Sequence, residues 1–268
     1  MKTTVIIPAR YNSTRFPGKP LQPIRGVPML QRVWAIARSV PEISDIIVAT
    51  DHDAIEEFCH QIGAACVRTS PDIRNGTERV AVVLDQLSHR PDVVINLQGD
   101  AVLTPPWVIQ AVIPPFASNP SIRMATPATL MQPEAYKTLI QAKQAGEAGG
   151  TTVVFDRHGN ALYFSKSPIP YVRDGAAPRV WRHIGLYAYA PQTLSDLLKL
   201  EPGPLEQQEQ LEQLRALENG IKIRVVPVDY QGRTHWGVDS PQDLARAEVL
   251  IDREGELLPV YNGSYRNL

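Results

Sequence analysis

The sequence predicts an α/β fold with a mostly parallel sheet flanked by helices, and three observations carry this prediction. Short β-branched and apolar runs recur, as at residues 5–7 and 45–50, which is typical of strands buried on both faces. Segments with apolar residues at helical spacing lie between these runs, as at residues 28–40. Strand, helix, strand, helix and strand then alternate over residues 4–68, an order that implies right-handed crossovers and parallel pairing.

Local signals set the expected limits of several elements. Pro8 cannot donate to a strand ladder and is expected to stop the first strand. Asp51 is expected to cap the helix that begins near Asp53, and Thr77 to cap the next. Leucines at helical spacing predict one helix over residues 204–220, with a buried stripe formed by Leu205, Leu211, Leu214 and Leu217. The other expected strands are 64–68, 92–99, 123–129, 151–155, 161–165, 181–189 and 223–228, and the other expected helices are 105–115, 133–144 and 239–251.

Whole-chain properties exclude several classes of protein. The chain has 268 residues with 27 Lys and Arg against 28 Asp and Glu, so no overall field favours nucleic acid or an acidic membrane surface. We find no signal-peptide pattern and no apolar run near the roughly 20 residues of a membrane span. Cys59 and Cys66 lack metal-ligand spacing and are interpreted as buried or idle thiols. These properties predict a soluble cytoplasmic protein.

Three cations follow the first predicted strand: Arg10, Arg15 and Lys19 lie in a loop that also holds Pro17 and Gly18. Open α/β folds bind ligands at the carboxyl ends of their strands, and cations this close together repel one another unless an anion joins them. A polyphosphate fits this demand, although any single arginine could belong to a solvated basic loop. Neither G-x-x-x-x-G-K-[ST] nor G-x-G-x-x-G is present, so the pattern alone predicts only an anion-binding α/β protein.

Two aspartates are candidate metal ligands. Asp100 follows the strand predicted at 92–99 and is expected at the same sheet edge, where beside a triphosphate it could hold Mg²⁺. The alternative is a helix cap or a turn residue. Asp239 opens the last predicted helix, and an N-cap role alone would explain it.

Residues 9–21, A-R-Y-N-S-T-R-F-P-G-K-P-L, resemble the signature loop of the 3-deoxy-D-manno-octulosonate (Kdo) cytidylyltransferases, and the similarity extends over roughly residues 4–250. The resemblance implies a single nucleotidyltransferase domain over residues 1–268, with a Rossmann-like core of the nucleotide-diphospho-sugar transferase type and a smaller strand-rich part for sugar binding and dimerisation. The expected parts are a nucleotide-binding part over 1–130, the smaller part over 131–220 and a return to the core over 221–255. It further implies a cytoplasmic, Mg²⁺-dependent homodimer that makes CMP-Kdo and pyrophosphate from CTP and Kdo for lipopolysaccharide or capsule.

Three stretches resemble the family's nucleotide and metal motifs. Residues 75–79, N-G-T-E-R, resemble S-G-T-[DE]-R, which contacts the base and ribose. Residues 98–102, Q-G-D-A-V, resemble Q-G-D-E-P, whose Asp is a magnesium ligand; Ala101 and Val102 replace its Glu and Pro. Residues 237–244 resemble G-V-D-T-P-E-D-L, whose first Asp is the other magnesium ligand. The implied nucleotide-binding residues are Ala9, Arg10, Arg15, Lys19, Asn75, Gly76, Thr77, Arg79 and Asp100; the implied catalytic residues are Lys19, Arg10, Asp100 and Asp239, the last two binding Mg²⁺.

Three further stretches imply contacts with an acidic sugar. Residues 163–170, Y-F-S-K-S-P-I-P, resemble Y-F-S-R-x-P-I-P, and Lys166 keeps the charge of that Arg but not its bidentate fork. Residues 183–187 resemble H-I-G-[IL]-Y, although a single His on a strand is more often structural. Residues 211–217 resemble L-E-Q-L-R-[AV]-L, although such glutamates often form a solvated face. The implied sugar contacts are Gln98, Lys166, His183, Tyr187, Glu212 and Gln213.

Three alternatives stay open. A relative could activate another ulosonic acid, such as an amino-Kdo analogue. A non-catalytic nucleotide-binding module would bind CTP without releasing pyrophosphate. A glycosyltransferase of similar fold would use a D-x-D metal motif, and Asp51-His52-Asp53 has that spelling.

Overall fold

The structure of the protein is a computed structural model that describes residues 1–12, 16–173 and 178–258. Arg15, one of the three cations expected in the first loop, lies outside the described residues.

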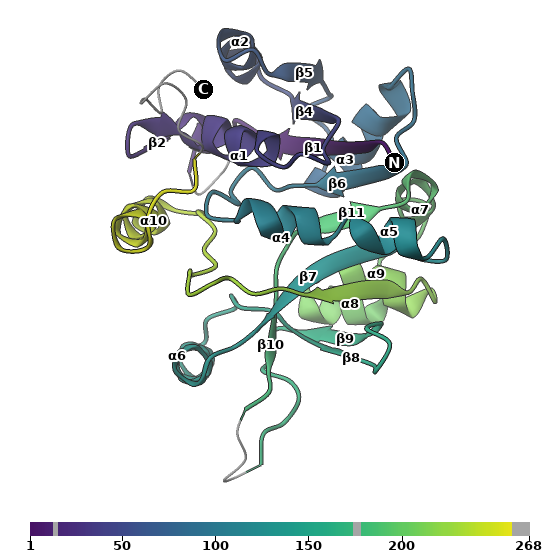
Figure 1. The fold of residues 1–268 in the computed structure, drawn as a ribbon, viewed down its shortest axis with the longest axis vertical. Helices are drawn as coiled ribbons and strands as arrows, with labels where there is room; N and C mark the ends of the chain where they lie inside the picture. Colours follow the sequence, from purple (N-terminus) through teal and green to yellow (C-terminus); the bar gives the residue numbers. More distant parts are fainter. Residues whose placement is uncertain (13–15, 174–177, 259–268) are drawn as a thin grey trace. The chain divides into compact units, whose positions relative to one another are not determined.

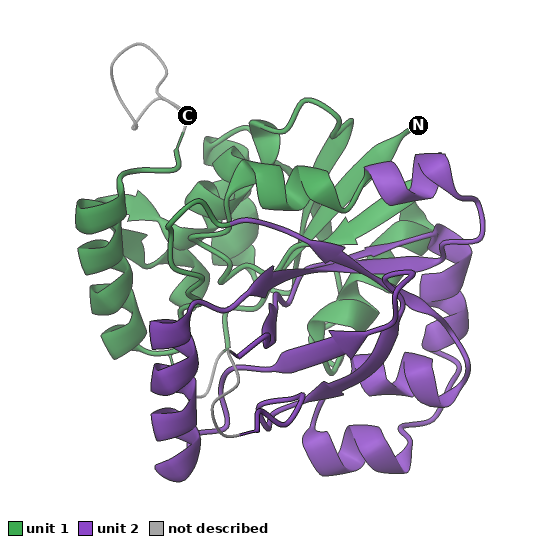
Figure 2. Ribbon diagram, turned by 60° about the horizontal axis from the view of Figure 1, so that its bottom comes forward, with its two compact units in different colours: residues 1–113, 230–268 green, residues 114–229 purple. Residues whose placement is uncertain are grey.

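Two compact units make up the chain (Figure 2). Unit 1 comprises residues 1–113 and 230–268, and unit 2 comprises residues 114–229. The part expected to bind the sugar and to dimerise, 131–220, lies within unit 2.

Parallel strands in the order β5-β4-β1-β6 form the centre of unit 1 (Figure 1). The pairing of β1 with β4 runs from Thr4↔Asp45 to Ala9↔Thr50. Helices connect these strands, and α1 and α3 both pack against β1 and β4, as expected for a mostly parallel sheet flanked by helices. The elements of unit 1 are β1 (Thr3–Ala9), the 3₁₀ turn η1 (Lys19–Leu21), β2 (Pro23–Ile24), β3 (Val27–Pro28), α1 (Met29–Arg38), β4 (Asp45–Thr50), α2 (Asp53–Gln61), β5 (Ala65–Arg68), α3 (Gly76–Gln86), β6 (Val93–Asn96), α4 (Pro106–Ala111) and α10 (Pro241–Glu254).

The first strand does not stop at Pro8, as the sequence predicted, because β1 continues to Ala9. The carbonyl of Ile6 accepts from Leu97 N–H, so that residue faces β6. Pro8, two positions on, faces the same side, and the ladder with β6 ends at Ile6↔Asn96. The missing N–H of Pro8 therefore breaks no strand-to-strand hydrogen bond.

The N-cap of α2 is His52, not Asp51 as the sequence predicted. The imidazole Nδ1 of His52 accepts from the N–H of Ala54 at 3.2 Å. Asp51 instead forms an ion pair with Arg79 at 2.8 Å. Either Asp51 or His52 could cap this helix, since each side chain can accept a hydrogen bond. Because buried Arg79 takes the carboxylate of Asp51 as its ion-pair partner, His52 is the cap.

Strand β7 organises unit 2, because it pairs antiparallel with β10 and β11 and parallel with β12. The strand expected at 181–189 is interrupted, since Leu186 N–H donates to the carbonyl of Ile184 in a tight turn. The elements of unit 2 are α5 (Pro114–Ser118), β7 (Met124–Leu130), α6 (Pro133–Gln144), β8 (Thr152–Phe155), β9 (Ala161–Ser165), β10 (Trp181–His183), β11 (Tyr187–Tyr189), α7 (Pro191–Leu197), α8 (Pro204–Glu209), α9 (Gln213–Glu218) and β12 (Ile223–Pro227).

The single helix expected at 204–220 is wrong: α8 ends at Glu209, and Gln210 has a left-handed backbone (φ 52°). The carboxylate of Glu209 accepts from Ser165 Oγ at 2.7 Å and from the N–H of Lys166 at 2.8 Å. These bonds tie the end of α8 to β9, and the chain turns before α9. Leu205, expected in the buried stripe, is 41% exposed.

Among the described residues, no helix combines the length and the apolar character needed to cross a membrane.

Candidate active site

A cavity of about 320 Å³ lies in unit 1, where β1 and β6 end. Its walls come from segments far apart in the sequence: the end of β1 and the loop after it, the start of α3, the segment after β6 and the segment before α10. This is the edge at which open α/β folds bind ligands. The residues that line the cavity are Pro8, Ala9, Arg10, Asn12, Lys19, Pro20, Gly76, Arg79, Gln98, Gly99, Asp100 and Asp239.

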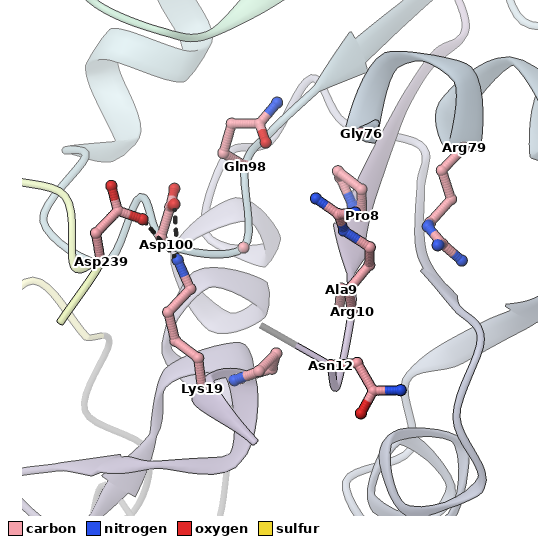
Figure 3. A pocket seen from close by; sticks show the side chains of 12 residues that line it. Pro8, Ala9, Arg10, Asn12, Lys19, Gly76, Arg79, Gln98, Asp100 and Asp239 are labelled. Carbon is pink, nitrogen blue, oxygen red and sulfur yellow. Dashed lines mark hydrogen bonds and ion pairs between the residues drawn. The ribbon is translucent and has the colours of Figure 1, made fainter. Parts of the chain in front are cut away.

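Lys19 joins the two candidate aspartates (Figure 3). Its Nζ lies 3.1 Å from Asp100 Oδ2 and 3.1 Å from Asp239 Oδ1, and it donates to the carbonyl of Val238 at 2.9 Å. The lysine side chain is only 16% exposed, whereas those of Asp100 and Asp239 are 32% and 53% exposed. Asp100 and Asp239 lie 81 and 220 positions after Lys19 in the sequence. In the fold, the one cation and the two carboxylates thus meet at one point.

Two glycines shape the backbone that presents these groups. Gly18 has φ +67° and begins the 3₁₀ turn that carries Lys19, a conformation that glycine adopts without strain. A Cβ at Gly99 would lie 3.0 Å from the carbonyl oxygen of Pro8, so only glycine lets the segment before Asp100 pass this close to β1.

Ala101 and Val102, which replace the Glu and Pro of the family motif, continue the turn after Asp100. Ala101 N–H donates to the carbonyl of Gln98 at 3.0 Å, and Val102 is fully buried. The replacement of the family's Glu and Pro by Ala101 and Val102 therefore leaves Asp100 at the cavity.

The interpretation of Asp239 as a helix cap is wrong. Ser240 is the N-cap of α10, and it forms a reciprocal capping box with Asp243. The backbone N–H of Asp239 also donates to Asp243 Oδ2, at 3.1 Å. Because its neighbours satisfy the helix start, the carboxylate of Asp239 is directed to Lys19. Asp100 is not a cap either, because the N-cap of α4 is Pro105.

The start of α3 contributes Gly76 and Arg79 to the cavity. Asn75, not Thr77, caps this helix, with Oδ1 accepting from Glu78 N–H at 2.9 Å. Thr77 is 6% exposed and its hydroxyl accepts from the amide of Asn96. Neither Asn75 nor Thr77 is among the residues that line the cavity.

Arg79 is fully buried, and its guanidinium donates to Asp51 and to the hydroxyl of Thr69. Burial lowers the pKa of this guanidinium, and the Asp51 carboxylate opposes that effect.

The remaining predicted residues of unit 1 also lie at the cavity. Ala9 is buried at the end of β1, and exposed Arg10 donates from Nη1 to the carbonyl of Arg74 at 3.3 Å. Gln98, expected to contact the sugar, donates to Asn96 Oδ1 at 3.0 Å and lines this cavity. Sequence reasoning missed Asn12, although it belongs to the same signature loop.

The charges of the cavity suit a metal-bound polyanion. Arg10, Lys19 and Arg79 line it together with the carboxylates of Asp100 and Asp239, and Asp51 pairs with the guanidinium of Arg79. Within residues 1–12, 16–173 and 178–258, no group of three His, Cys, Asp or Glu side chains could hold a metal ion. Mg²⁺, however, commonly binds one or two carboxylates and completes its shell with water and substrate phosphates. Asp100 and Asp239 therefore fit Mg²⁺ as the protein half of such a shell.

In unit 2, His183 is 8% exposed and its pKa is lowered to about 3 by burial. Its Nε2 lies 3.0 Å from Thr126 Oγ1, which donates to the carbonyl of Leu186 at 2.8 Å. The hydroxyl has one proton, so Nε2 carries the N–H and Nδ1 is left as an acceptor. A neutral, partly satisfied histidine fits both the structural interpretation and a hydrogen-bonding role.

Two other predicted sugar contacts have buried polar atoms. Tyr187 Oη and Gln213 Nε2 are buried and find no hydrogen-bond partner among the described residues. Tyr187 is 5.4 Å from His183 between ring centroids, and burial raises its pKa well above the usual value. Unpaired buried polar groups are costly in a folded protein.

Lys166 lies beside other cations of unit 2. Burial lowers the pKa of Lys143, and the nearby charges of Lys166 and Arg182 lower it further. The pKa of Tyr187 is raised mainly by burial and then by Tyr189. The charge of Glu212, the other predicted contact, raises it further. The structure thus brings Glu212 near Tyr187. It places Lys166 among groups of both signs, because Glu147 and Glu209 also act on Lys143 and Glu209 accepts from the N–H of Lys166.

The D-x-D interpretation finds no support in the geometry. Asp51 pairs with Arg79, and Asp53 pairs with Arg68 at 2.8 Å. Neither carboxylate lines the cavity.

A parallel α/β unit with basic side chains at the carboxyl ends of its strands is typical of nucleotide-binding proteins. A sequence model described as cytidylyltransferase matches residues 4–223, and the chain belongs to this family. The resemblance to the cytidylyltransferase family that residues 9–21 indicated is confirmed.

Individual relatives are more specific. The chain is 51% identical over 260 residues to the 3-deoxy-manno-octulosonate cytidylyltransferase of Maricaulis maris, covering 96% of this chain and 100% of the relative. It is 40% identical to the 8-amino-3,8-dideoxy-manno-octulosonate cytidylyltransferase of Shewanella frigidimarina, covering 94% and 99%. A solved structure of CMP:2-keto-3-deoxy-manno-octonic acid synthetase complexed with CTP matches with a TM-score of 0.84 and 35% identity, covering 95% and 100%.

Proposed function

We propose that the protein is a 3-deoxy-manno-octulosonate cytidylyltransferase that forms CMP-Kdo and pyrophosphate from CTP and Kdo. The observation that carries the proposal is the convergence of Lys19, Asp100 and Asp239 at one cavity edge. The relative from Maricaulis maris and the CTP-bound neighbour support both substrates. The amino-Kdo alternative is less favoured, since that relative is 40% identical against 51%.

The reaction is an in-line substitution at the α-phosphorus of CTP. The anomeric hydroxyl oxygen of the sugar forms the new P–O bond and loses its proton, while the bond to the β-phosphate breaks and pyrophosphate leaves with the electron pair. Positioning and charge neutralisation supply most of the catalysis in such transfers. Lys19 and Arg10 would neutralise phosphate charge.

We propose Mg²⁺ as the cofactor, with Asp100 and Asp239 as its protein ligands. The ion would screen the phosphates and acidify the attacking hydroxyl. The fit of this carboxylate pair to a hard cation supports the assignment.

For the sugar, we propose contacts from Lys166, His183, Tyr187, Glu212 and Gln213. We propose Gln98 as a further sugar-binding residue. The buried Oη of Tyr187 and Nε2 of Gln213 support hydrogen bonds to hydroxyl groups. The retained charge of Lys166, with Lys143 and Arg182 nearby, supports an acidic substrate.

We also propose a cytoplasmic homodimer that serves lipopolysaccharide or capsule synthesis. Leu162 (62% exposed) and Leu205 (41% exposed) of unit 2 are apolar side chains that a partner protomer would cover. The free thiols of Cys59 and Cys66 suit a reducing compartment. Sedimentation analysis tests the dimer.

The central test measures pyrophosphate release from each nucleoside triphosphate with a panel of ulosonic acids, with and without Mg²⁺. We expect release only with CTP, Mg²⁺ and a ulosonic acid, fastest with Kdo. Faster turnover of the 8-amino analogue would favour that alternative, and CTP binding without release would indicate a non-catalytic module.

A further inference from the structure

The segment Asp51-His52-Asp53 lies beside the cationic loop rather than in the cavity. The imidazole of His52 stacks on the ring of Tyr11, with centroids 3.9 Å apart and an angle of 11° between the planes. Tyr11 directly follows Arg10 at the start of the loop. The stack therefore joins the cationic loop to the turn between β4 and α2.

Tyr11 in turn holds the other end of the loop. Its carbonyl accepts from the N–H of Gly18 at 2.9 Å. Its ring also faces Gly18, since a Cβ on that glycine would lie 3.5 Å from Tyr11 Cζ. Gly18 immediately precedes Lys19, the residue that meets Asp100 and Asp239, so Tyr11 lies directly against the start of the turn that carries the lysine.

His52 is itself held in place. Its Nδ1 caps α2 by accepting from Ala54 N–H at 3.2 Å, and its own N–H donates to Thr50 Oγ1 at 3.4 Å. The preceding residue, Asp51, is tied to buried Arg79. The imidazole is therefore held in one position, and the Tyr11 ring of the more exposed cationic loop stacks on it.

We propose that His52 is a positioning residue: by stacking on Tyr11 it preorganises the described part of the cationic loop, Arg10 to Asn12 and Phe16 to Lys19, for the triphosphate. The inference rests on the proposed binding of CTP. Without the stack, a smaller fraction of the molecules has the loop in its binding-competent conformation. The apparent affinity for CTP falls in proportion to that fraction. Aromatic pairs of this kind correspond to a roughly two- to tenfold change in an equilibrium constant.

Two substitutions separate the stack from the helix cap. His52→Asn keeps a good N-cap acceptor but removes the aromatic ring, whereas His52→Phe keeps a ring and removes the acceptor. His60→Asn, on the exposed face of the same helix, is the matched control. The measurements are the Kd for CTP by calorimetry, KM for CTP and for the sugar, kcat, and the midpoint of thermal unfolding.

For His52→Asn we expect the Kd and KM for CTP to rise about two- to tenfold, with kcat, the sugar KM and the unfolding midpoint near those of the wild type. For His52→Phe we expect a lower unfolding midpoint and a CTP affinity within about twofold of the wild type, by the same reasoning. The inference is overturned if His52→Asn binds CTP as the wild type does, or if His52→Phe weakens CTP binding as much as His52→Asn. Failure of the proposed function is distinguishable, because the wild type would then release no pyrophosphate from CTP.

Discussion

Asp100→Asn separates a catalytic role from a structural one because the two roles predict effects of very different size. The substitution keeps the shape of the side chain and removes its charge beside Lys19, at 3.1 Å. If the pair only stabilised the fold, its loss would cost about 0–1 kcal/mol, the usual value for partly exposed ion pairs. The Lys19 ammonium would also keep its contacts with Asp239 and the carbonyl of Val238. We therefore expect little change in the free energy of unfolding.

Turnover should respond far more strongly. Removal of one group that neutralises transition-state charge typically lowers kcat on the order of 10²–10³, and Asp100 is also proposed to hold Mg²⁺. The assay is pyrophosphate release at saturating CTP, Kdo and Mg²⁺, with urea unfolding measured on the same preparations.

Asp53→Asn is the matched control, because it removes a carboxylate that pairs with Arg68 at 2.8 Å outside the cavity. We expect it to leave kcat within about twofold of the wild type, since exposed ion pairs contribute little. A kcat for Asp100→Asn within about tenfold of the wild type, well short of the expected loss, would refute the assignment of Asp100 to the reacting phosphates.

Three further substitutions test other parts of the structure. Gly99→Ala places a methyl group 3.0 Å from the Pro8 carbonyl and should destabilise the fold by about 1–3 kcal/mol in urea unfolding; Gly185→Ala, where a Cβ meets nothing within 4 Å, should not. Ser240→Ala removes the N-cap of α10 and should cost about 1 kcal/mol in the same assay, whereas a similar loss in Ser240→Thr would count against the cap. His183 has its pKa lowered from 6.5 to about 3 by burial, so the unfolded chain takes up the proton first and stability should fall as pH drops from about 6.5 towards 3. His183→Gln should flatten that slope, and an unchanged slope would contradict the assignment.

The central sheet and the cationic edge could be predicted from the sequence. The apolar runs that become β1 and β4 are buried by parallel pairing, and their carboxyl ends lie at one edge for any such topology. Lys19 and Asp100 could therefore be expected at the same cavity. Asp239 could not be placed by pattern alone, because an aspartate at a helix start has the same appearance whether it caps the helix or binds a ligand. The capping box of Ser240 decides between the two.

The errors arose where a tertiary contact selects between neighbouring residues. Asp51 is a good cap in isolation, but buried Arg79 requires a carboxylate, so His52 takes the cap. The leucine pattern of 204–220 favours one helix, but the bonds from Glu209 to the end of β9 interrupt it. Pro8 is tolerated in β1 because β6 has already ended on the side that it faces.

The most direct test of the account is the Mg²⁺ dependence of CTP affinity, measured by calorimetry in the wild type and in Asp239→Asn. If Lys19, Asp100 and Asp239 grip one metal-bound triphosphate, Mg²⁺ should tighten CTP binding in the wild type, and this gain should vanish in Asp239→Asn. An equal gain in both proteins would show that the metal is held elsewhere and would contradict the account.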